Sequence, residues 1–189
     1  MRRRPSWPAF TLIAFAAACA HQPSGMTEPL PATAADARTL DYLRGRQLIV
    51  PVAGVTPERV PDTFDAVRGT RRHAALDILA PRGTAVLSAD DGRVIRLASN
   101  AAGGITVYAT DPGERLVYYY AHLERYHHGL IAGMRLSKGD TIGYVGTTGN
   151  SPRDIPHLHF QVMLSIPGRG HWEGLPIDPR PYLTPNGSR

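Results

Sequence analysis

The sequence predicts an all-β domain, mainly antiparallel and folded as a sandwich or barrel, with few short helices. Short runs of β-branched and aromatic residues recur along the chain. Turn signals separate them, such as Asp-Asp-Gly at residues 90–92 and Asp-Pro-Gly at residues 111–113. Runs with this spacing favour antiparallel strands over alternating strands and helices. The predicted strands cover residues 48–50, 84–88, 93–97, 105–109 and 116–120.

An export signal is predicted at the N-terminus. Residues 2–4 are arginines, and residues 9–18 are apolar except for Thr11. This apolar stretch is shorter than the roughly 20 residues that a membrane-spanning helix needs. A cationic start followed by a short apolar stretch is typical of a signal peptide. We therefore assign residues 1–18 to a signal peptide.

Cys19, the only cysteine of the chain, follows this segment directly. The small residues before it resemble the lipobox of bacterial lipoproteins, with Ala16 at the position where leucine is usual. We expect Cys19 to become the lipidated N-terminus, which anchors the protein to the outer membrane on its periplasmic side. The alternative is cleavage after Ala20, which releases a soluble periplasmic or secreted protein. Because the chain has no second cysteine, the domain has no disulfide framework.

Residues 19–46 predict a flexible tether and a short helix before the domain. Small residues and prolines dominate residues 20–38, a composition typical of flexible linkers. The short helix is expected at residues 35–43, and residues 47–185 suit a single domain. Without the three arginines of the signal, the formal charge falls from +5 to +2. This nearly neutral balance argues against nucleic-acid binding.

Two spaced motifs supply the nitrogen and oxygen donors that zinc prefers. His157 and His159 lie two residues apart, so on a strand both imidazoles would point to one face. His73 and Asp77 would lie about 13 Å apart in an extended strand, so we predict a bend at residues 74–75 that leads into a strand. A catalytic zinc ion takes three protein ligands and leaves a position for water, which would indicate a hydrolase. Scattered surface histidines are the alternative.

Six segments in a fixed order extend the pattern over residues 48–183. They are His73 and Asp77 with the residues up to Val86, Asp-Gly-Arg-Val at 91–94, Tyr-Ala-His-Leu at 120–123, Lys-Gly-Asp-Thr-Ile-Gly at 138–143, Gly-Thr-Thr-Gly at 146–149 and His-Leu-His-Phe at 157–160. In this order the chain resembles the lysostaphin-type (LytM-like) zinc metallopeptidases, which cut cross-bridges or stem peptides of bacterial peptidoglycan.

The resemblance implies a β-rich domain, one zinc ion at a groove and peptidoglycan as the substrate. By position it makes His73, Asp77 and His159 the zinc ligands. It makes His122 and His157 the catalytic pair, which polarises or deprotonates water and stabilises the oxyanion. The alternative is a non-catalytic LytM-like module that binds the cell wall or activates another peptidoglycan hydrolase; such relatives typically lose ligands, and this chain retains all of them.

The cleaved bond is either a D-alanine–diaminopimelate cross-link or part of a glycine-containing bridge, and a regulatory protein partner is not identified. Ala75 stands where the family usually has glycine, and a positive φ there would cost about 1 kcal/mol or more. We also expect Thr147, Thr148 and Asn150 to line the groove, and His127 and His128 to be ordinary surface residues.

Overall fold

The computed structural model describes residues 37–187. The predicted signal peptide, Cys19 and most of the predicted tether lie outside these residues. Within them, no helix is both long enough and apolar enough to cross a membrane.

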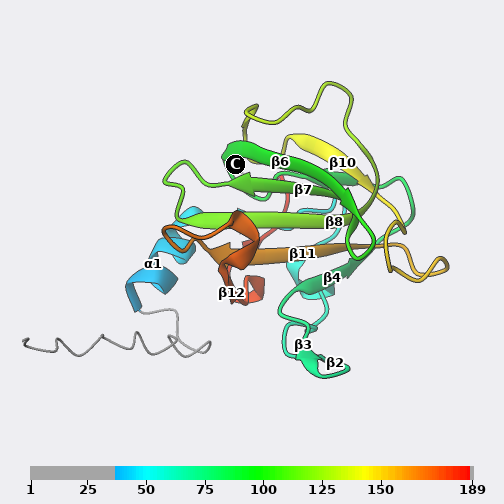
Figure 1. Cartoon of the computed structure of the whole chain (residues 1–189), viewed down its shortest axis with the longest axis horizontal. Helices are drawn as coiled ribbons and strands as arrows, with labels where there is room; N and C mark the ends of the chain where they lie inside the picture. The colour runs from blue at the N-terminus through cyan, green and yellow to red at the C-terminus, as the bar shows by residue number, and fades with distance from the viewer. Residues whose placement is uncertain (1–36, 188–189) are drawn as a thin grey trace, which may run out of the picture. The chain divides into compact units, whose positions relative to one another are not determined.

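One antiparallel sheet of nine strands forms the centre of the domain (Figure 1). Six strands follow one another in the order β12-β11-β8-β7-β6-β9, β4 pairs with β11, and β10 pairs with both β8 and β5. The strands are β4 (Leu76–Leu79), β5 (Ala85–Leu87), β6 (Gly92–Asn100), β7 (Gly104–Thr110), β8 (Leu116–Tyr126), β9 (Arg135–Leu136), β10 (Thr141–Val145), β11 (His157–Leu164) and β12 (Leu175–Ile177).

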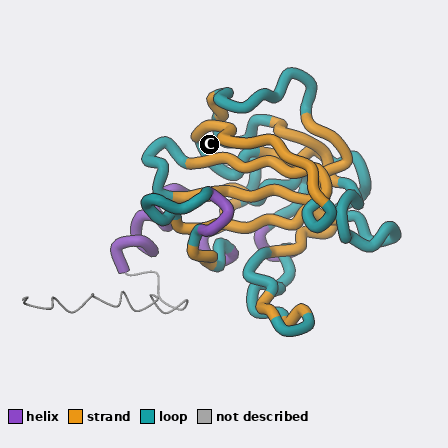
Figure 2. Tube along the Cα trace, viewed as in Figure 1, coloured by secondary structure: helices purple, strands orange, loops and turns teal. Residues whose placement is uncertain are grey.

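Shorter elements surround this sheet, and strands account for most of the regular structure (Figure 2). A parallel pair joins the two ends of the domain, and a small hairpin precedes β4. These elements are the helix α1 (Ala37–Arg46), the pair β1 (Leu48–Ile49) and β13 (Leu183–Thr184), the hairpin β2 (Val67–Arg68) and β3 (Arg71–Arg72), and the single helical turns Pro57–Arg59, His171–Glu173 and Arg180–Tyr182. The predicted all-β, mainly antiparallel fold with few short helices is confirmed.

The two faces of the central strands carry different side chains: one face packs into the core, and the other carries the histidines of the site. On β11, Leu158 and Phe160 are fully buried on one face, whereas His157 and His159 point to the other. The same alternation on β8 puts Tyr118 and Tyr120 into the core. Each fully buried large apolar side chain contributes roughly 1.5–3 kcal/mol to folding. The strands that carry the histidines are therefore held rigidly by their opposite face.

Helix α1 packs on the sheet domain. Leu43 is fully buried in the core cluster, and Arg46 at the C-terminal end of the helix donates two hydrogen bonds to the buried Asp90, at 2.6 and 2.9 Å. The Tyr118 hydroxyl donates to the same carboxylate at 2.7 Å. The helix overlaps the one predicted at residues 35–43 and ends three residues later. The helix just before the predicted domain boundary at residue 47 thus contacts the domain.

Candidate metal centre

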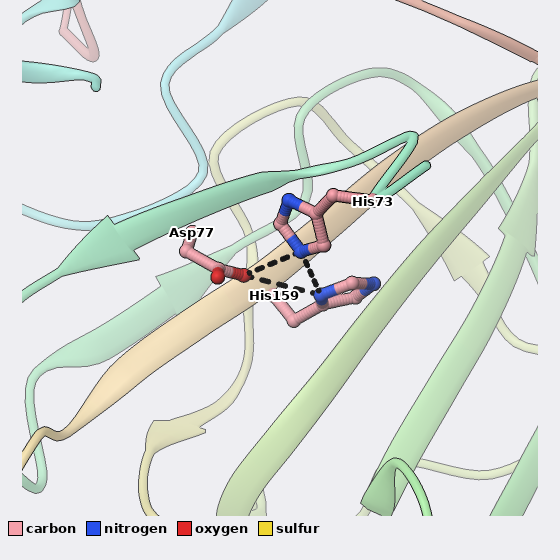
Figure 3. A group of neighbouring side chains, drawn as sticks. All are labelled: His73, Asp77 and His159. Carbon is pink, nitrogen blue, oxygen red and sulfur yellow. Dashed lines mark hydrogen bonds and ion pairs between the residues drawn. The ribbon is translucent and has the colours of Figure 1, made fainter. Parts of the chain in front are cut away.

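Three donor atoms converge where β4 and β11 lie side by side (Figure 3). His73 Nε2, Asp77 Oδ1 and His159 Nδ1 form a triangle in which every edge is 3.1 Å. Tetrahedral zinc with ligand distances of about 2.0–2.1 Å places its donor atoms about 3.3 Å apart. The triangle therefore has the size and the donor chemistry of a site for one such cation.

Strand register explains how two of these residues meet. His159 on β11 stands directly opposite Asp77 on β4 in the antiparallel ladder, and side chains in such pairs have Cβ atoms about 4.5–5.5 Å apart. His73 precedes β4 and is turned back toward the pair by a bend at Ala74, whose φ is 58°. The predicted bend at residues 74–75 is confirmed.

The left-handed residue of this bend is Ala74 and not Ala75. Ala75 is fully buried and is absent from the positive-φ residues of the described chain. The expected backbone cost at Ala75 was therefore assigned to the wrong residue. The strain falls one position earlier, because the chain reverses directly after His73 so that β4 can begin at Leu76.

Thr63 forms hydrogen bonds with both residues of the His73–Asp77 pair. Its carbonyl oxygen lies 2.9 Å from His73 Nδ1, so this nitrogen carries the hydrogen and Nε2 presents a lone pair to the triangle. Its hydroxyl oxygen accepts a hydrogen bond from the backbone N–H of Asp77 at 3.0 Å and donates to the Ala75 carbonyl at 3.2 Å. A single threonine thus orients one imidazole and the start of β4.

The charge of Asp77 is stabilised inside the site. Burial raises the pKa of Asp77, but hydrogen bonds from His159 and His73 outweigh it and hold that pKa well below its usual range. Its second oxygen, Oδ2, accepts a hydrogen bond from Arg68 at 2.6 Å. The pKa of His73 is raised, first by its hydrogen bond to Asp77. A cation at the triangle would therefore compete with a proton on His73.

Two buried histidines flank the triangle. The ring of His122 lies 5.0 Å from that of His157 and 5.7 Å from that of His159, measured between centroids. His157 Nδ1 lies 2.8 Å from the Ile155 carbonyl oxygen, and its Nε2 lies 3.7 Å from Asp77 Oδ1. Because Nδ1 faces a carbonyl, it carries the hydrogen, and Nε2 is the ring nitrogen that His157 presents to the site.

His122 occupies a strained position. It has a φ of 61°, at a point where the β7–β8 register shifts by a bulge between Ile105 and Val107. A bulge with a left-handed residue re-aims a side chain that regular alternation would point elsewhere. Burial is the largest cause that lowers the pKa of His122, to about 4. The ring is thus neutral at pH 7.

A cavity of about 340 Å³ opens over these five residues. His73, Asp77, His122, His157 and His159 all line it, so the structure brings together every metal and catalytic residue expected from the sequence. Asn150 lines it as predicted. Thr147 and Thr148 do not: the Thr147 hydroxyl accepts from Arg82, and Thr148 contributes its carbonyl to His122. His127 and His128 are exposed, as predicted.

Several lining residues were not found by sequence reasoning. Those with polar or charged side chains are Tyr119, Ser151 and three arginines of the β2–β3 hairpin, Arg68, Arg71 and Arg72. The available signal was the density of arginine just before the first histidine motif, with three in residues 68–72. Thr63 gave no signal, because its role depends on contacts with residues 10 to 14 positions away.

The sheet and the three converging donor atoms define a β-rich domain with the donor arrangement of a metal site. The chain belongs to peptidase family M23: the model of that family matches residues 71–179, more than half of the sequence. The expected resemblance to the lysostaphin-type peptidases is thereby confirmed.

Two curated relatives are peptidoglycan endopeptidases by name. The chain is 33% identical over 120 residues to the L-Ala--D-Glu endopeptidase of Bacillus subtilis, a match that covers 61% of this chain and 35% of that protein. It is 33% identical over 95 residues to the peptidoglycan DD-endopeptidase ShyC of Vibrio cholerae, which covers 50% of this chain and 21% of that protein. The match thus spans about a third of the first relative and a fifth of the second.

Solved structures show the same fold. LytU superposes with a TM-score of 0.55 at 29% identity, over 66% of this chain and 83% of that one. Lysostaphin from Staphylococcus simulans gives a TM-score of 0.55 at 26% identity, over 66% of this chain and 48% of that one.

Proposed function

We propose that this protein is a zinc-dependent endopeptidase that hydrolyses peptide bonds in bacterial peptidoglycan. The observation that carries the proposal is the triangle of His73 Nε2, Asp77 Oδ1 and His159 Nδ1, with the basic nitrogen of His157 beside it. The names of the relatives, which include an L-Ala--D-Glu endopeptidase and a peptidoglycan DD-endopeptidase, support peptidoglycan as the substrate.

The triangle would hold the zinc ion, which when bound supplies Lewis-acid polarisation of a carbonyl and acidifies water. His122 and His157 supply the proton transfers. Each ring donates its Nδ1–H to a backbone carbonyl, from Thr148 and Ile155 respectively, so Nε2 is the nitrogen of each ring that can accept a proton. Once protonated, the same nitrogen donates to the oxyanion or to the departing amine. No serine or cysteine nucleophile is required.

The decisive experiment is mass spectrometry of muropeptides after purified, zinc-loaded protein is incubated with peptidoglycan sacculi. We expect new products with the wild type and none with His159→Ala, together with loss of one metal equivalent in the variant. Equal products from His159→Ala would refute the ligand assignment. Unchanged muropeptides with metal bound would favour the second candidate, a non-catalytic module that activates another hydrolase. The complete donor set argues against that candidate.

For the rest of the chain, we propose a signal peptide at residues 1–18, a lipid on Cys19 and a tether that leads into the domain of residues 47–185. Attachment to the outer membrane would place the site in the periplasm, where peptidoglycan lies. An Escherichia coli relative, 28% identical over 117 residues, bears the name lipoprotein YgeR, which supports this arrangement. Incorporation of labelled fatty acid into the wild type, and its loss in Cys19→Ser, tests it.

A further inference from the structure

We propose, on the basis of the peptidase function above, that arginines of the β2–β3 hairpin bind a free carboxylate of the peptide substrate next to the scissile bond. Arg71 is the principal contact, and Arg68 and Arg72 lie on the same hairpin. We call these three side chains the arginine wall. The site would then prefer carboxylate-bearing stem peptides and cross-links over uncharged glycine bridges.

The hairpin lies where such a contact is needed. It is the segment before β4 and projects away from the sheet, below that strand in the view of Figure 1. Its three arginines line the same cavity as His73 and Asp77. A peptide bound at the donor triangle therefore lies close to these arginines.

The hairpin places like charges together. Arg68 and Arg71 are directly opposite each other in the β2–β3 ladder, and like charges in this position destabilise a hairpin. A bound anion next to the two guanidinium groups would reduce that repulsion. The two-residue strands themselves are exposed, so packing does not require arginine at either position.

The partners of the three guanidinium groups differ. Arg68 pairs with Asp77 Oδ2 at 2.6 Å, and Arg72 pairs with Asp65 at 3.2 Å while its guanidinium lies 4.8 Å from the Phe64 ring centroid. Among the ion pairs of residues 37–187, none involves Arg71. The Asp77 carboxylate is the one acidic group among the lining residues. The cavity lining thus holds three arginines and one carboxylate, and Arg71 is the arginine left for a ligand because Arg68 and Arg72 each pair with an aspartate.

The chemistry of guanidinium indicates the ligand. Its planar donors match a carboxylate in a bidentate pair, which is stronger than a neutral hydrogen bond. Residues such as D-glutamate and diaminopimelate carry a carboxylate beyond the peptide backbone, whereas glycine carries none. The arginine wall therefore selects between the two substrate classes that the sequence left open.

The test compares two synthetic peptides that are identical except at one group. Both contain a D-alanine–diaminopimelate cross-link, and the diaminopimelate carboxylate beside the scissile bond is either free or amidated. Dissociation constants are measured by calorimetry with the full chain carrying His157→Ala, so that the peptides stay intact. The measurement is repeated with Arg71→Gln, with Arg71→Lys, and with Arg135→Gln as a control at an exposed β9 arginine outside the cavity.

We expect the free carboxylate to bind about tenfold more tightly than the amide, as one exposed charge-assisted pair allows. The ratio should fall to about one in Arg71→Gln, be intermediate in Arg71→Lys and remain in Arg135→Gln. Equal binding of both peptides by the parent, or equal weakening of both by Arg71→Gln, would overturn the proposal. If the protein binds the free carboxylate selectively but the wild type cleaves neither peptide, the carboxylate subsite is supported and the endopeptidase function is refuted.

Discussion

His122 Nδ1 lies 2.8 Å from the carbonyl oxygen of Thr148, and this contact sets which nitrogen of the ring faces the cavity. The loop that carries Thr148 approaches the start of β7 so closely that side chains are excluded. A Cβ atom on Gly104 would lie 2.1 Å from the Thr148 hydroxyl oxygen, and one on Gly149 would lie 2.3 Å from Gly104 N. Because these two positions have no side chain, the loop can lie close enough to β7 for the Thr148 carbonyl to contact His122.

His122→Asn should remove activity while the protein stays folded. The substitution deletes the imidazole that moves protons, and such groups contribute about 10²–10⁴-fold to rate. Asparagine tolerates the left-handed conformation that residue 122 adopts, with φ at 61°. The measurements are kcat on a cross-linked peptide, bound zinc and the thermal midpoint. Full activity in His122→Asn would contradict the assigned role, and so would loss of bound zinc from that variant.

The low pKa of His122 makes stability depend on pH. Burial is the main cause that lowers this pKa to about 4, from an ordinary value of 6.5. Between these values the unfolded chain binds a proton that the folded chain does not. The free energy of unfolding therefore falls as the pH falls through this window, by at most about 3 kcal/mol. Denaturant titrations of metal-free protein should show this slope in the wild type and a shallower one in His122→Asn.

Removing the Thr63 hydroxyl should weaken metal binding without touching a ligand. Thr63→Val deletes the acceptor of the Asp77 N–H and the donor to the Ala75 carbonyl. Partners that orient metal ligands are worth about 10–100-fold in affinity. A competition titration with a zinc chelator measures the loss. Thr63→Ser retains the hydroxyl and serves as the control, and equal affinities for the two variants would exclude this role.

Ala74→Gly and Ala75→Gly should change stability in opposite directions. Ala74 has a φ of 58°, which costs an alanine roughly 1–2 kcal/mol, so glycine should raise the free energy of unfolding by about 0.5–1 kcal/mol. Ala75 is fully buried outside that region. Glycine there loses a packed methyl group and should lower the free energy of unfolding by about 1 kcal/mol. Denaturant unfolding of both variants checks the sign.

Arg46→Ala should destabilise the domain by about 3 kcal/mol. It leaves the Asp90 carboxylate, whose side chain is 0% exposed, with Lys138 at 3.6 Å as its remaining cation. Breaking a buried pair on one side costs about 3–5 kcal/mol, and Lys138 keeps the loss at the lower end. Arg44→Ala is the matched control, because Arg44 pairs with Asp41 at the surface and such pairs contribute about 0–1 kcal/mol. Similar losses in the two variants would show that Asp90 is not held by Arg46.

The strands and the residues that supply the metal-donor atoms could be predicted from the sequence. The short β-branched and aromatic runs predicted the strands at residues 93–97, 105–109 and 116–120, and these lie within β6, β7 and β8. The spacing of His73 and Asp77 required a bend, because one cation cannot bridge an extended pair, and the bend is present at Ala74. Local sequence determines these features because they depend on residue period and on chain geometry.

The tertiary structure decided how these residues are aimed and what surrounds them. The orientation of His122 depends on Thr148, 26 residues away, and that of His73 depends on Thr63. The hairpin arginines line the cavity only because β4 pairs with β11, which joins segments 82 residues apart at Asp77 and His159. Such contacts arise from strand register and close backbone approach, which no local pattern encodes.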